Sequence, residues 1–140
     1  MRLAVTVAIA AIIAVFFLPG SATPLGVSRF RETQVTYFDR GNVPGDTEIW
    51  RTRVWLQHKF QTVGTGAIAC INIDVRSDVR ECQGTYVLPR GRIQVAGQII
   101  TRRSFQLTIV GGTGVYTGVG GTAIFTGLPN PAEVIFYLQT

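Results

Sequence analysis

The sequence has few of the residues from which metal sites and nucleophilic sites are usually built. Its 140 residues include one histidine, two cysteines and one methionine, and charged residues make up 15%. Two cysteines and one histidine are too few for a closed zinc site, which takes four ligands. The sequence also has no Gly-Lys-Ser/Thr phosphate loop and no Ser/His/Asp arrangement that sequence alone supports. We therefore expect no metal and no cofactor.

A sustained helical period is also missing after residue 22, so helix is confined there to short pieces. Alternation of apolar and polar residues instead predicts eight short strands joined by turns rich in glycine and proline. Closing such a sheet removes the edges that would otherwise aggregate. The expected fold is an all-β, eight-stranded antiparallel barrel preceded by an N-terminal signal-peptide helix. The predicted strands cover residues 34–39, 52–62, 67–76, 81–88, 92–100, 105–110, 122–126 and 134–139.

The N-terminus has the pattern of a secretory signal peptide. Arg2 is followed by an uncharged run from Leu3 to Leu18, and small residues lead to a cleavage site after Ala22. The sequence thus predicts a leader at 1–22 and one secreted, extracellular domain at 23–140. The alternative is an uncleaved membrane anchor, since the apolar run is slightly long for a leader.

The net charge of +5 favours acidic surfaces, polysaccharide or lipid head groups as partners for an exported chain, or serves only solubility. Trp50 and Trp55 beside Arg51 and Arg53 resemble a platform for stacked bases. Export makes nucleic acid an improbable partner, and amphipathic rings at a subunit contact or barrel mouth explain these residues equally well.

Cys70 and Cys82 fall on consecutive strands of one predicted hairpin, whose turn lies near Arg76 and Ser77. They can therefore lie opposite each other at the short Cα separation that a disulfide needs. Export makes the oxidised form the expected one, and a reactive thiol or metal pair is the alternative.

A glycine-rich stretch, residues 109–123, is predicted to be a tight corner between two strands, because glycine permits positive φ and close backbone approach. It joins strand to strand and its spacing does not fit a dinucleotide site. The residues assigned to the turn are Gly111, Gly112, Gly114, Tyr116 and Gly118, with Tyr116 closing the end of the sheet.

The motif Gly-Gly-Thr-Gly-x-Tyr-x-Gly at 111–118 resembles the late-strand signature of the allene oxide cyclase barrel superfamily, which includes the dirigent proteins. Pro44-Gly45-Asp46, Cys70, Cys82 and the run 91–97 follow in the order and rough spacing of its small secreted bacterial branch. The resemblance extends from about Phe30 to the C-terminus. It implies a barrel with a cavity and, since oligomers are common in the superfamily, a homo-oligomer.

The resemblance also bears on chemistry. Cyclases of the family are similar to one another in a Glu-x-Asn pattern on the first strand. At the resembling positions this chain has Gln34 and Thr36, and Gln34 cannot ionise. The dirigent relatives imply a different action, in which the cavity places a reactive intermediate and excludes water. The candidate cavity residues are Gln34, Thr36, His58, Phe60, Tyr86 and Tyr137. His58 is interpreted either as a proton carrier or as an interior residue satisfied by hydrogen bonds.

Two functions of different class follow from the sequence. The first is a secreted isomerase-like or dirigent-like barrel that binds a small apolar metabolite and guides its cyclisation or coupling. The second is a non-catalytic extracellular carrier or structural barrel. An open cavity with converging polar groups favours the first, while a filled interior with scattered polar positions suits the second.

Overall fold

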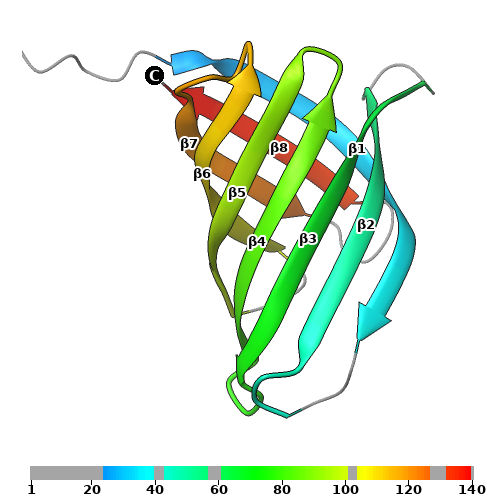
Figure 1. The fold of residues 1–140 in the computed structure, drawn as a ribbon, viewed down its shortest axis with the longest axis vertical. Helices are drawn as coiled ribbons and strands as arrows, with labels where there is room; N and C mark the ends of the chain where they lie inside the picture. The colour runs from blue at the N-terminus through cyan, green and yellow to red at the C-terminus, as the bar shows by residue number, and fades with distance from the viewer. Residues whose placement is uncertain (1–23, 40–42, 57–60, 101–103, 127–131, 140) are drawn as a thin grey trace, which may run out of the picture.

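The computed structural model describes residues 24–39, 43–56, 61–100, 104–126 and 132–139. They form eight strands, each antiparallel to the next, and β1 also pairs with β8, so that the sheet closes into a barrel (Figure 1). The strands are β1 (Pro24–Asp39), β2 (Thr47–Leu56), β3 (Thr62–Asp74), β4 (Val79–Leu88), β5 (Gly91–Ile99), β6 (Ser104–Gly114), β7 (Gly120–Thr126) and β8 (Ala132–Gln139). The all-β antiparallel barrel expected from the sequence is confirmed.

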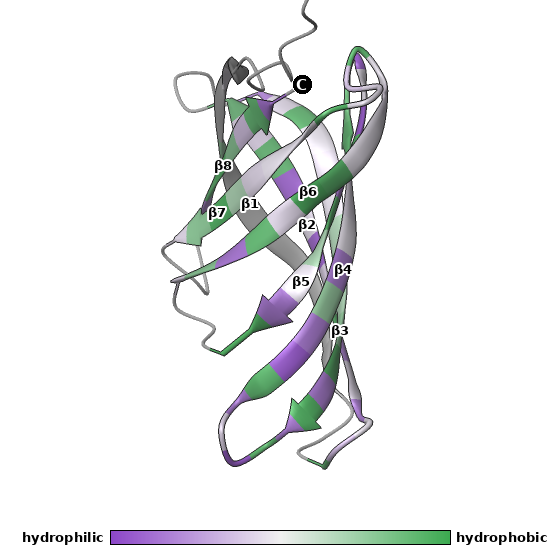
Figure 2. Cartoon of the chain, turned by 90° about the vertical axis from the view of Figure 1, so that its left-hand side faces the viewer, coloured by the Kyte–Doolittle hydropathy of each residue, from purple (hydrophilic) through white to green (hydrophobic). Residues whose placement is uncertain are grey.

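Alternation of apolar and polar residues explains why the chain curls in this way. Along β6, Phe105, Leu107 and Ile109 are buried while the residues between them are exposed, so each strand has one face turned inward. Hydrophobic and hydrophilic bands alternate in the same way along β4 (Figure 2). The inward side chains form one cluster: Phe30, Val54, Ile68, Cys70, Cys82, Tyr86, Leu88, Ile93, Val95, Ile99, Phe105, Leu107, Ile109, Val119, Ala123, Phe125, Val134, Phe136 and Leu138.

Several strand limits differ from the prediction. β1 begins at Pro24, ten residues before the predicted start, and β2 begins at Thr47. A single strand from 52 to 62 is wrong, because Thr62 belongs to β3 and pairs back with Trp55, where the register shifts. Residues 57–60 lie outside the described part of the chain.

The glycine-rich corner is shorter than predicted. Residues 111–114 continue β6, and the turn itself covers 115–118. Gly112 is required in the strand, because a Cβ there would lie 2.5 Å from the carbonyl oxygen of Arg92 and 2.6 Å from Cβ of Tyr116. Gly118 has φ +74° in the turn, and Tyr116 packs against the interior cluster. Of the five residues assigned to the turn, Gly111, Gly112 and Gly114 therefore belong to β6.

The hairpin of β3 and β4 contains the predicted disulfide. Cys70 and Cys82 are Cα partners across the two strands, with their Cα atoms 4.0 Å apart. The connecting turn covers 75–78, which includes the predicted position at Arg76 and Ser77. Both sulfurs belong to the interior cluster, so the bond joins two strands from inside the barrel.

The predicted leader, residues 1–22, lies outside the described residues. Among the residues that are described, no helix is long and apolar enough to cross a membrane.

Candidate functional site

Aromatic rings fill the interior of the barrel and touch one another in series. Phe105 stacks on Phe125 with ring centroids 4.6 Å apart, and Tyr86 lies 6.2 Å from Phe125. Tyr86 also meets Phe136 edge-on at 5.0 Å. At one end of the series, Trp50 lies 6.0 Å from Phe105. The interior rings therefore form one connected aromatic series from Trp50 to Phe136.

A buried polar cluster lies where β2 begins, β3 ends and β4 begins. Glu48, Asn72 and Arg80 are 1%, 4% and 4% exposed, which is rare for charged side chains. Arg80 Nε lies 3.0 Å from Glu48 Oε2 and donates a hydrogen bond of 3.0 Å to Asn72 Oδ1. Arg80 Nη2 also binds the carboxylate of Asp78 in the β3–β4 turn. We call these four residues the polar cluster.

Strand register places the three buried members of the polar cluster inside the barrel. Asn72 is the Cα partner of Arg80, and the next inward-facing pair along the same strands is Cys70 and Cys82. Glu48 is in turn the Cα partner of Cys70. Because Cα partners in antiparallel strands share a face of the sheet, Glu48, Asn72 and Arg80 lie with the disulfide on the inner face, while Asp78 lies in the turn.

Trp50 connects the polar cluster to the aromatic interior. Its indole Nε1 donates a hydrogen bond of 2.9 Å to Glu48 Oε1, while its ring faces Phe105. The Glu48 carboxylate is thus held between a guanidinium and an indole N–H. The ion pair with Arg80 and the hydrogen bond from Trp50 together restrain the orientation of this carboxylate in a water-poor site. Such a group can orient a ligand or respond to charge that develops on it.

A glycine makes room for the central tyrosine. Gly66 is the Cα partner of both Thr52 and Tyr86. A Cβ on Gly66 would lie 2.5 Å from Cε1 of Tyr86 and 2.6 Å from Oγ1 of Thr52. The missing side chain therefore lets the Tyr86 ring lie against the inner wall.

The structure separates the predicted cavity residues. Tyr86 is fully buried in the interior. Tyr137 lies between the buried Phe136 and Leu138 and so faces outward, which corrects its assignment to the cavity. His58 and Phe60 lie outside the described residues.

Gln34 and Thr36 are described by their backbone pairing alone. Gln34 is the Cα partner of Thr52, and Thr36 that of Arg51, with a register shift between them. Thr52 is half-buried beside Tyr86, whereas Arg51 is exposed. A bulge thus separates two positions that the sequence suggested as neighbours on one face.

Sequence reasoning missed Glu48, Asn72 and Arg80. Glu48 precedes the predicted start of its strand, although it continues the even-numbered alternation of Thr52 and Val54. Extending that alternation back two steps finds both Trp50 and Glu48 on the inner face. No such signal pairs Arg80 with Glu48, because the pairing depends on register between β2, β3 and β4.

Within the described residues, no three histidine, cysteine, aspartate or glutamate side chains gather in a way that would hold a metal ion.

Hydrogen bonds at the turn of the β3–β4 hairpin stabilise the ionised form of Asp74. Asp74 accepts hydrogen bonds from the Ser77 hydroxyl at 2.7 Å and from the Arg76 amide at 2.9 Å. The hydrogen bond from the Ser77 hydroxyl makes the larger contribution and the one from the Arg76 amide the smaller. Together they hold the pKa of Asp74 below its usual value of 3.8.

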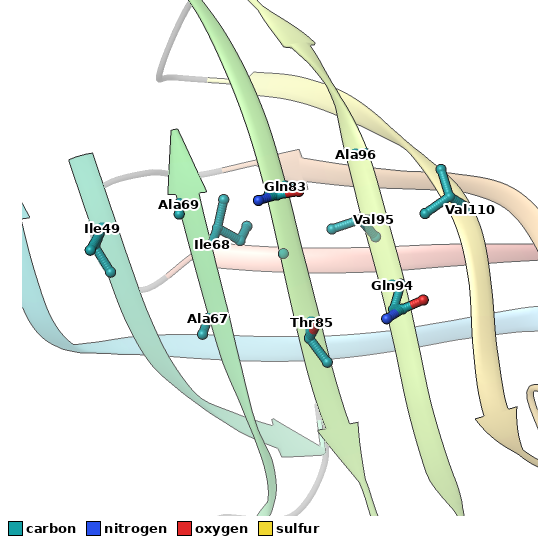
Figure 3. Close-up of a pocket in the computed structure, with 11 residues that line it drawn as sticks. Ile49, Ala67, Ile68, Ala69, Gln83, Thr85, Gln94, Val95, Ala96 and Val110 are labelled. Carbon is teal, nitrogen blue, oxygen red and sulfur yellow. The ribbon is translucent and has the colours of Figure 1, made fainter. Parts of the chain in front are cut away.

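A groove of about 510 Å³ lies on the outer face of the sheet, across β2 to β6 (Figure 3). Ile49 on β2 and Val110 on β6 lie at its two sides, and residues of β3, β4 and β5 lie between them (Figure 3). Its lining residues are Ile49, Ala67, Ile68, Ala69, Gln83, Gly84, Thr85, Gln94, Val95, Ala96 and Val110, none of them charged. We call this surface the outer groove. Most of its lining residues face outward, while Ile68 and Val95 also belong to the interior cluster.

No protein-family model and no curated protein sequence matches the chain. Solved structures do match. A pyocyanin demethylase superposes with a TM-score of 0.73 at 20% identity, over 81% of this chain and 99% of that one. The exo-specific intermolecular Diels-Alderase AbnU gives 0.71 at 16% identity, over 86% and 100%. The pterocarpan synthase dirigent protein GePTS1 gives 0.66 at 14% identity, over 90% and 98%.

The chain therefore has the barrel fold that a dirigent protein shares with a Diels-Alderase and a demethylase. The resemblance to the allene oxide cyclase and dirigent-like superfamily is confirmed at the level of the fold. Identities of 20% or less show the fold alone, and one fold supports many chemistries, so the activity has to be argued from the site.

Proposed function

We propose that the protein is a secreted barrel that binds a small apolar molecule in its interior and guides the cyclisation or coupling of that molecule. Guidance of this kind requires placement and exclusion of water more than a strong acid or base. The aromatic rings from Trp50 to Phe136 supply the apolar surface. The polar cluster supplies an oriented carboxylate at one end of it.

The observation that carries this proposal is the contact of Trp50 with both parts of the interior. A buried Glu–Arg pair is costly to desolvate and adds little stability over apolar packing. Here the pair lies beside the aromatic rings, and its carboxylate accepts a hydrogen bond from one of them, Trp50. An apolar surface with a few convergent polar groups is the usual arrangement of a small-molecule site.

The structural neighbours support a reaction of this class. AbnU is described as a Diels-Alderase and GePTS1 as a pterocarpan synthase, and both have the same barrel. For the present chain we propose ring closure or coupling, without assigning either neighbour's substrate. Secretion, cleavage after Ala22 and assembly of several copies belong to the same proposal, and Gln34, Thr36, His58 and Phe60 stay candidate contacts.

A non-catalytic carrier or structural barrel is the second candidate. It is favoured by the close packing of Tyr86, Phe125 and Phe136, which are 0%, 1% and 0% exposed. A filled interior suits a structural role, because an eight-stranded barrel is just wide enough to be filled by side chains or to hold one small ligand.

Native mass spectrometry of protein purified from culture medium tests these alternatives. The proposed function predicts a mature chain that begins at Thr23 and retains a small apolar molecule, which denaturation releases. Chromatography on a chiral column then follows that molecule with and without protein. Faster or stereoselective conversion supports guidance of the reaction, unchanged conversion of a retained molecule supports the carrier, and absence of any bound molecule supports the structural barrel.

A further inference from the structure

Three arginines lie on the outer face of the barrel, away from the carboxylates at the β3–β4 turn. Asp74 and Asp78 belong to that turn or border it. The arginines are exposed and lie farther along the sheet, toward the β4–β5 turn: Arg51, Arg53 and Arg92. None of the three has an ion pair within the described residues, so their charge is available to a partner.

Strand register places these arginines along one edge of the outer groove. Arg53 and Arg92 are the ends of a single row across β2 to β5, with one residue each from β3 and β4 between them. Three strand spacings separate them, which is about 14 Å along the sheet. Arg51 is the Cα partner of Ala67, a lining residue of the groove. We call these three arginines the arginine edge; the row at the opposite edge contains Glu81.

The groove itself is lined by neutral hydrogen-bonding groups and small side chains. Its volume of about 510 Å³ is within the range of small-ligand sites. The outward side chains of β3, β4 and β5 in its lining are Ala67, Ala69, Gln83, Thr85, Gln94 and Ala96 (Figure 3). The amide and hydroxyl groups among them can each donate and accept hydrogen bonds, as the hydroxyls of a sugar do. The charge that a ligand meets here comes from the arginine edge.

We propose that the outer groove binds a segment of an acidic polysaccharide. Its sugar hydroxyls form hydrogen bonds with Gln83, Thr85 and Gln94, and its uronate carboxylates bind the arginine edge. A planar guanidinium matches a carboxylate with two parallel hydrogen bonds. The proposal uses the secretion proposed above, and it does not depend on a ligand in the aromatic interior.

Other anionic partners fit this surface less well. Nucleic-acid bases stack on aromatic rings, and no lining residue of the groove is aromatic. The head group of an anionic lipid uses the arginine edge alone and leaves the amides of Gln83 and Gln94 without a ligand. A uronate chain uses both parts of the surface, because each of its units carries hydroxyls as well as a carboxylate.

Isothermal titration calorimetry of the oxidised mature protein, in the assembly that it forms, tests the proposal at low salt. The probe is a galacturonate hexamer. Its fully methyl-esterified form has the same sugars without the charge and is the matched ligand control. We expect the charged hexamer to bind at one per chain and about tenfold more tightly than the ester, with an affinity that falls as salt is added.

Substitutions separate the charge from the shape of the groove. Arg53→Gln and Arg92→Gln should each weaken binding of the charged hexamer about two- to fivefold and leave binding of the ester unchanged. Ala69→Leu adds bulk to the groove without changing the charge, and should abolish binding of both hexamers. Arg76→Gln removes an exposed charge from the β3–β4 turn; it is the matched control and should change neither.

Several results would overturn the proposal. One is the absence of binding by the charged hexamer, and another is equal affinity for the acid and its ester. An effect of Arg76→Gln as large as that of Arg92→Gln would show attraction to the net charge alone. Tighter binding of a single-stranded DNA oligomer or of phosphatidylglycerol vesicles, weakened by Arg92→Gln, would assign the arginine edge to a nucleic acid or a membrane instead.

Discussion

The indole of Trp50 donates a hydrogen bond of 2.9 Å to the carboxylate of Glu48, which is buried inside the barrel. The same indole lies 6.0 Å from the ring of Phe105, so one side chain contacts both the polar cluster and the aromatic interior. A structural change in either part should therefore alter the environment of the Trp50 indole.

The first prediction concerns the ion pair between Glu48 and Arg80. Arg80→Met leaves the Glu48 carboxylate buried without its guanidinium, and should lower the free energy of unfolding by about 3 kcal/mol. Glu48→Gln keeps the shape of the side chain and should cost less. Urea unfolding of the wild type, both single variants and the double variant measures the coupling, which we expect to be about 1–3 kcal/mol. Additive effects would contradict a direct interaction.

The second prediction concerns the disulfide. Replacing both Cys70 and Cys82 by alanine should lower the free energy of unfolding by about 3 kcal/mol, because the bond closes a short loop and restricts the unfolded chain. Thermal unfolding with and without a reductant checks this. The reductant should lower the melting temperature of the wild type and leave that of the double variant unchanged; equal melting temperatures without reductant would refute a stabilising bond.

The third prediction concerns the space that Gly66 leaves for Tyr86. Gly66→Ala should destabilise the protein by about 2 kcal/mol, because the added Cβ would lie 2.5 Å from the tyrosine ring and force it away from the wall. Gly120→Ala in β7 is the matched control, since its nearest neighbour is 3.8 Å away and its backbone has no positive φ. Chemical unfolding measures both variants. Equal costs would show that the effect comes from the loss of glycine rather than from the clash.

The fourth prediction concerns pH. The lowered pKa of Asp74 means that its ionised form is favoured in the folded protein, so its contribution to stability is present above about 3.8 and is lost as the pH falls through the folded pKa. A carboxyl-detected NMR titration should find this pKa below 3.8. Ser77→Ala removes the main hydrogen bond and should move the pKa upward, whereas Glu81→Gln should not move it. An Asp74 pKa at or above the usual value would refute this.

The periodicity of the sequence was sufficient to predict the barrel and the disulfide. Inward and outward residues alternate clearly on β4, β5 and β6, and Cys70 and Cys82 flank a recognisable turn on consecutive strands. Periodicity did not locate the corner before β7, because Gly112 and Gly114 are needed for close backbone approach within a strand as well as in a turn.

The interior residues were harder to predict, because a strand pattern gives two faces without saying which one turns inward. Tyr137 was placed in the cavity although its neighbours Phe136 and Leu138 fill that side. Glu48 and Arg80 are 32 positions apart in the sequence and meet through the register of three strands, two of which contain shifts. Contacts of this kind are set by tertiary pairing, which local sequence does not encode.

Binding of an uncharged apolar probe inside the barrel is the most direct test of the central claim. In Trp55→Phe, Trp50 is the single tryptophan, and titration with N-phenyl-1-naphthylamine should quench its emission, saturating at one probe per chain. Ala123→Leu, which adds bulk on the inner face and whose folding circular dichroism would verify, should weaken this quenching, while Ala69→Arg on the outer groove should leave it unchanged. Absence of quenching, or quenching abolished by Ala69→Arg and unaffected by Ala123→Leu, would contradict an interior binding site.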